Sequence, residues 1–86
     1  MHKYNIEQAK YEADYKIFLV FDDQSKGIVD LKHFIFNNNF SVFKRLQDKQ
    51  QFKNFIIKNH ILVWGDDLDL APEFLYDLLL NNKKIK

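Results

Sequence analysis

The chain has 86 residues, 47% of them hydrophobic, and its 13 basic and 12 acidic residues give a formal net charge of +1. The length predicts a single domain over residues 1–86, and the hydrophobic content excludes intrinsic disorder. The nearly neutral charge excludes a global field that draws the chain to nucleic acid or membranes, and the lack of cysteine excludes disulfides and thiolate chemistry.

Three strands are predicted in the first part of the chain. Tyr4–Ala13 alternates apolar and polar residues with a change of phase near Gln8, which predicts an edge strand with a bulge. Tyr15–Phe21 is rich in aromatic and β-branched residues and apolar on both faces, which predicts a central strand covered on both sides. Asp22–Gly27 has the composition of a turn, and Ile28–Leu31 returns from it to complete a hairpin.

Short helical turns are predicted in the middle of the chain. Lys32–Phe36 forms either a short helix or an extended turn, and Asn37–Asn39 forms a loop tip. Phe43 and Leu46 have the i, i+3 spacing of a helical turn. Asp48 is expected to cap the next turn by accepting a backbone N–H.

The last third of the chain predicts a second hairpin and then a helix. Phe55–Lys58 and Ile61–Trp64 form the hairpin, with a short connection between them. Pro72 stands at the first helical position, which tolerates a missing N–H, and Asn81 and Asn82 are expected to end the helix. The apolar stripe of this helix consists of Phe74, Leu75, Leu78 and Leu79.

These elements predict an α+β fold. A small, mostly antiparallel sheet of about five strands with two hairpins packs against the C-terminal helix, with the short helical turns between them. The longest clean apolar run, Ile17–Phe21, is far shorter than the roughly 20 residues of a membrane helix, and the N-terminal segment lacks the apolar region of a secretory signal. We therefore expect a soluble, cytoplasmic protein that does not enter membranes.

Asp66, Asp67 and Asp69 raise the question of an acidic site. A calcium loop of the EF-hand kind needs a glycine at its sixth position and a glutamate at its twelfth, and no register of this segment provides them. We interpret Asp66 and Asp67 as turn residues and Asp69 as a residue that favours the helix start. Histidine ligand pairs are missing, and Ser25 and Ser41 lack a nucleophile motif, so we predict no catalytic residue, no metal, no cofactor and no enzyme activity.

Two binding functions remain open. Trp64, Tyr76, Tyr11 and Phe40 are either core residues or anchors for a protein partner, and the first strand offers an edge that another chain can extend. Tyr11, Phe40 and Trp64 are the candidate interface residues, for a partner protein or for self-association. The alternative is a small nucleic-acid-associated regulator, indicated by the basic tail KKIK, the Lys44/Arg45 pair and the many aromatic residues. Those aromatic residues lie among aliphatic ones, which favours core packing over base stacking.

A group of residues near the C-terminus carries a family resemblance: Trp64, Asp69, Leu70, Pro72, Leu75 and Tyr76. With the segments DYKIFLVFDD, IVDL and VFKRLQDKQQF, they make the chain similar to the bacterial and phage domain-of-unknown-function family 2442 over nearly its whole length. Two departures are the longer hairpin turn DDQSKG and Ala71, which stands where the family often has a serine.

The resemblance implies a small α+β domain whose sheet packs against the C-terminal helix, with no established catalytic residues. It implies structural roles for the shared residues: Trp64 and Tyr76 brace a strand against the helix, and Asp69 and Pro72 start the helix. It also implies an antitoxin-like protein that binds the product of a small neighbouring gene.

Overall fold

The computed structural model of the chain describes residues 4–37, 41–65 and 67–85. The elements follow one another as β1 (Ile6–Ala13), β2 (Lys16–Phe21), β3 (Lys26–Asp30), α1 (Lys32–Phe36), the 3-10 helix η1 (Ser41–Gln47), α2 (Lys49–Phe52), β4 (Phe55–Lys58), β5 (Ile61–Trp64), β6 (Leu68–Leu70) and α3 (Pro72–Ile85). The predicted α+β fold is confirmed, with six strands in the described part of the chain where about five were expected.

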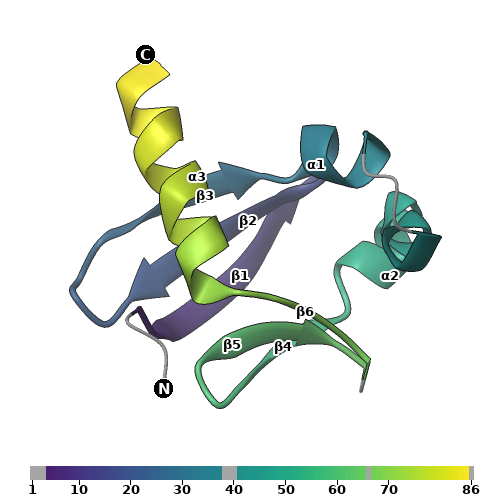
Figure 1. Cartoon of the computed structure of the whole chain (residues 1–86), viewed down its shortest axis with the longest axis horizontal. Coiled ribbons are helices and arrows are strands. Elements are labelled where there is room, and N and C mark those ends of the chain that lie inside the picture. The colour runs from purple at the N-terminus through teal and green to yellow at the C-terminus, as the bar shows by residue number, and fades with distance from the viewer. Residues whose placement is uncertain (1–3, 38–40, 66, 86) are drawn as a thin grey trace.

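The strands form two antiparallel sheets of three strands each, in the orders β1-β2-β3 and β4-β5-β6. Helix α3 runs across one face of the first sheet, and the second sheet lies beside the start of that helix (Figure 1). The sheets meet where the backbone N–H of Ile6 in β1 donates to the carbonyl oxygen of His60 at 3.1 Å. The predicted hairpins are therefore present, but each belongs to its own sheet.

The first sheet follows the sequence pattern closely. β2 lies between β1 and β3, and the β1–β2 register shifts between Ile6 and Gln8, where the bulge was predicted. The predicted turn closes the β2–β3 hairpin, because the Phe21 N–H donates to the Ser25 carbonyl oxygen at 2.8 Å. A second register shift, between Tyr11 and Ala13, was not predicted.

Short sequence patterns also predicted the elements in the middle of the chain. The Asp48 carboxylate accepts the backbone N–H of Gln50 at 2.9 Å and so caps α2, as predicted. The β4–β5 hairpin turns on Asn59 and His60, whose φ angles of 53° and 66° are the left-handed values of a two-residue turn of the primed type. Of the predicted loop tip, residues 38 and 39 lie outside the described residues.

The join between β5 and α3 differs from the prediction. Leu68–Leu70 forms β6, in which Asp69 pairs with Val63, so Asp69 is a strand residue and not a helix-start residue. The alternation Leu-Asp-Leu buries both leucines when it pairs with β5, and this burial outweighs the turn preference of aspartate. Helix α3 does begin at Pro72, where the Ala71 carbonyl oxygen accepts the N–H of Phe74 at 3.1 Å.

Helix α3 also extends beyond its expected end. It continues to Ile85, so Asn81 and Asn82 do not terminate it. Asparagine is a weaker helix former than alanine by less than about 1 kcal/mol, which is too little to stop a helix without an accompanying cap.

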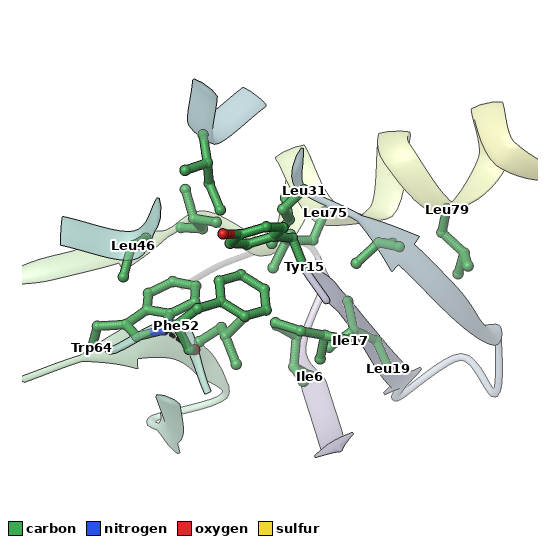
Figure 2. Packing of buried hydrophobic residues seen from close by; sticks show 14 of the residues in the cluster. Ile6, Tyr15, Ile17, Leu19, Leu31, Leu46, Phe52, Trp64, Leu75 and Leu79 are labelled. Carbon is green, nitrogen blue, oxygen red and sulfur yellow. Dashed lines mark hydrogen bonds between the residues drawn. The ribbon is translucent and has the colours of Figure 1, made fainter. Parts of the chain in front are cut away.

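The buried side chains of both sheets and α3 form one hydrophobic cluster. In Figure 2, Ile17 and Leu19 of β2 lie near Leu79 of α3, while the rings of Phe52 and Trp64 lie side by side. Each sheet thus gives one face to a shared core. The expectation that β2 is covered on both faces is wrong, because the side chains of its second face are only half-buried.

Candidate interaction surface

Trp64 lies in the core with 2% of its surface exposed. Its indole N–H donates to the backbone carbonyl oxygen of Phe52 at 2.7 Å, and its ring packs against the rings of Phe52 and Phe55. The indole therefore ties β5 to the end of α2. Of the candidate interface residues, this one presents no surface to a partner.

Tyr11 lies on the inner side of β1, where its ring meets the edge of Phe52 with centroids 6.2 Å apart. The Lys53 ammonium lies 5.6 Å from the Tyr11 ring centroid, and the Tyr11 hydroxyl donates to the Asp14 carbonyl oxygen at 3.1 Å. Tyr11 is half-buried by these contacts. Phe40, the remaining interface candidate, lies outside the described residues.

Tyr76 joins α3 to the first sheet. Its ring stacks on Tyr4 with centroids 4.0 Å apart and meets Phe21 edge-on at 5.0 Å. Its hydroxyl donates to the Asp23 carboxylate at 2.6 Å and lies 3.2 Å from the Ser25 hydroxyl oxygen. This hydrogen bond lowers the pKa of Asp23, assisted by the Ser25 backbone N–H, and the same bond to Asp23 raises the pKa of Tyr76.

The acidic segment before β6 connects η1 to the end of β5 through Arg45. Arg45 of η1 donates to both carboxylate oxygens of Asp67, at 3.0 and 3.3 Å, and to the Trp64 carbonyl oxygen at 3.0 Å. The hydrogen bond from Arg45 and its charge lower the pKa of Asp67. Asp66 lies outside the described residues. Within the described ranges, no three His, Cys, Asp or Glu side chains gather in a way that could hold a metal ion.

The remaining predicted residues, Pro72 and Leu75, belong to the first turn of α3. Both are buried, and Leu75 packs into the hydrophobic cluster with its side chain fully covered. None of the helices within the described residues has the length and apolar character needed to span a membrane.

The outer face of the first sheet carries an apolar strip that points away from the core. In an antiparallel sheet, paired residues project to the same side, so Phe18 of β2 shares this face with Ile28 of β3. Val20 lies two residues along β2 and projects to the same side. Ile28 is 45% exposed, and Phe18 and Val20 are half-buried. We name these three residues the β2–β3 strip.

Lysines frame the β2–β3 strip. Lys10 of β1 is paired with Phe18, and Lys26 of β3 is paired with Val20, so these lysines stand on opposite edges of the sheet. Lys16 stands at the start of β2 on the same face, paired with Asp30. Across the described part of the chain, neither Lys10 nor Lys26 forms an ion pair. At the paired positions of the register, three lysines stand against one aspartate, and the exposed Glu7 and Glu12 stand at the register shifts of β1.

A hollow of about 420 Å³ adjoins the basic face. Asp30 lines it from the end of β3, where its carboxylate also accepts the Lys32 backbone N–H at 3.0 Å. Phe36 of α1, which is 45% exposed, lines it together with Lys32, His33 and Asn37. The hollow therefore offers an apolar ring among polar groups at the end of the β2–β3 strip.

The sequence contained a signal for this surface. Lys10, Lys16 and Lys26 occupy positions that the strand pairing brings to one face. The chain has only one predicted long helix, and one helix covers only one face of a sheet. Both observations indicate an open second face on β2, although its apolar residues alone suggested a covered one.

A comparison with family models matches residues 6–80 to the family described as Protein of unknown function (DUF2442). No curated protein and no solved structure matches the chain. The family match spans both sheets and the buried part of α3, which confirms the resemblance carried by the C-terminal motif. The chain therefore belongs to the DUF2442 family of proteins of unknown function.

Proposed function

We propose that the chain is a cytoplasmic, non-enzymatic protein-interaction module whose docking surface is the basic outer face of the first sheet. The observation that carries this proposal is the β2–β3 strip of Phe18, Val20 and Ile28 framed by Lys10 and Lys26. Apolar side chains at the centre and charged ones at the rim are the usual anatomy of a protein interface.

The charge of this face defines the partner. A complementary surface presents apolar side chains flanked by carboxylates, because Lys10 and Lys26 then gain ion-pair partners that the described residues do not supply. Phe36 and the hollow beside it give one partner side chain a place to anchor. In the antitoxin-like form of this proposal, the partner is a small protein whose own activity is blocked by docking.

Nucleic acid is the second candidate, favoured by Phe18 on a lysine-bearing sheet face. Sheets that bind single strands usually stack two or three bases on aromatic side chains. Val20 and Ile28 are aliphatic and give no ring on which a base can stack. A protein partner therefore fits this face better.

The test is an affinity pull-down from lysate of the source cell, run with and without nuclease and at low and high salt, using the wild-type chain and two charge variants. The double variant Lys10→Glu/Lys26→Glu reverses the rim of the docking surface. Lys44→Glu is the matched control, because Lys44 is an exposed lysine of η1 and not a sheet residue. The retained protein is then purified and titrated against all three chains.

We expect one protein that binds the wild type and Lys44→Glu equally and binds the double variant at least about tenfold more weakly, which is a loss of about 1.4 kcal/mol. Nucleic acid that is retained only without nuclease and released at high salt supports the second candidate. A protein that binds all three chains with one affinity contradicts the assignment of the surface.

A further inference from the structure

The outer face of the second sheet carries a different arrangement of side chains. Ile56 of β4 pairs with Val63 of β5, and both project away from the core, as does Ile61. Ile56 is 58% exposed, the highest value for a large apolar side chain in the described residues. Lys58, paired with Ile61, and Asp69, paired with Val63, complete the face.

The two charges stand at diagonal corners of this face. Lys58 lies on β4 and Asp69 on β6, the two outer strands, and they occupy neighbouring rows of the register. Strand spacing and residue rise place their Cα atoms roughly 12 Å apart. A hollow of about 200 Å³ lies along β5 and β6 and is lined by Lys58, Asn59, Ile61, Val63, Gly65, Leu68 and Asp69.

We propose that this face is self-complementary and binds a second copy of the chain about a two-fold axis. A two-fold interface brings the same patch of both copies together, so it must match itself in charge. The two-fold axis lies in the plane where the second sheets of the two copies face each other and passes over the middle of the face. Lys58 of each copy then lies opposite Asp69 of the other. The apolar side chains Ile56, Ile61 and Val63 then meet at the centre.

The outer face of the first sheet cannot pair with itself in this way. Lys10, Lys16 and Lys26 of one copy would face a surface carrying the same three lysines, with Asp30 as the one counter-charge at a paired position. Like charges brought together across an interface oppose association. The charge pattern therefore separates two surfaces, one suited to an acidic partner and one suited to a second copy.

The area of this face limits how tightly two copies can bind. Three strands of about four residues cover on the order of 200 Å². Stable complexes bury about 800 Å² on each partner. We therefore expect a weak dimer whose population rises with protein concentration and which leaves the first sheet open.

The experiment is sedimentation equilibrium of the full chain from about 10 µM to about 1 mM. Lys58→Asp and Asp69→Lys, each made alone, place like charges opposite one another twice in the dimer. We expect each to weaken dimerisation by about tenfold, and the double variant Lys58→Asp/Asp69→Lys to restore it to within about threefold of wild type. Circular dichroism and Trp64 emission confirm that each variant is folded.

Lys44→Glu is the control, because it reverses an exposed lysine of η1, outside both sheets, and should leave the dimer unchanged. A wild-type chain that remains monomeric at the highest concentration overturns the proposal. So does a double variant that dimerises as weakly as the single ones, because restored pairing is the property that only this arrangement predicts.

Discussion

Trp64 and Tyr76 each use a ring and a hydrogen bond donated by that ring's polar group to join two elements, but they do so in opposite surroundings. Trp64 is buried, and its N–H donates to a backbone carbonyl oxygen, that of Phe52, at 2.7 Å. Tyr76 is half-buried, and its hydroxyl donates at 2.6 Å to Asp23, whose carboxylate is exposed to solvent.

The lengths of these two hydrogen bonds do not decide how much each contributes to stability. A buried acceptor that loses its donor stays without a partner, whereas water replaces the donor at an exposed acceptor. The slightly longer bond of Trp64 should therefore matter more to stability than the shorter bond of Tyr76. Substitutions at both positions test this ranking directly.

Trp64→Ala should have the largest effect. Removing a fully buried ring costs about 3–5 kcal/mol through lost burial and the cavity left behind. A chain of this length has a total stability of roughly 4–13 kcal/mol, so the variant should be strongly destabilised or unfolded. Urea denaturation followed by far-ultraviolet circular dichroism measures the loss. Full stability in this variant would mean that the indole does not brace β5 against α2.

Trp64→Phe and Tyr76→Phe form a matched pair, because each removes one donor and keeps an aromatic ring. Trp64→Phe leaves the Phe52 carbonyl oxygen without this donor in the interior, which should cost about 1–3 kcal/mol. Tyr76→Phe should cost clearly less, because water can donate to Asp23. Urea denaturation at neutral pH, with circular dichroism as the signal for both variants, gives the comparison. Equal losses would contradict the role assigned to burial.

The family resemblance implied that both aromatic residues brace a strand against the C-terminal helix, but not which one is buried. Tyr76 does join α3 to the first sheet, whereas the ring contacts and hydrogen bond of Trp64 are with Phe52 of α2 and Phe55 of β4. The C-terminal motif places Trp64 in a strand and Tyr76 in a helix, and both locations are correct. Their partners lie 12 residues away for Trp64, in Phe52, and 53 residues away for Tyr76, in Asp23. Such pairs form only when separate elements pack together, and strand or helix periodicity carries no information about them.

Local chemistry explains which other elements could be predicted. The Asp48 cap and the Pro72 helix start depend on neighbouring residues, and both are present. Strand β6 depends on pairing with β5, so a three-residue segment among aspartates gave too weak a signal. The outer face of β2 was missed for the same reason, because coverage of a strand is decided by elements elsewhere in the chain.

The smallest effect should be a change of stability with pH. Of the two contacts compared, only that of Tyr76 with Asp23 can show it. The pKa of Asp23 is lowered from 3.8 by the hydrogen bond from Tyr76, so this stabilisation is present above pH 3.8 and is lost as the pH falls through the lowered value. The pKa of Tyr76 is raised from 10.0, so its contribution is present below pH 10.0 and is lost as the pH rises through the raised value. The indole of Trp64 does not titrate in this range.

Asp14 and Asp67 also have lowered pKa values, through Lys49 and Arg45, so acid weakens several contacts at once. The difference in unfolding free energy between wild type and Asp23→Asn isolates the contribution of Asp23. We expect this difference to be constant from about pH 5 to about pH 9 and to shrink below pH 3.8. Urea titrations followed by the emission of Trp64, the single tryptophan, measure it at each pH. A difference that does not change down to the acid transition would show that the Asp23 charge adds nothing to the contact with Tyr76.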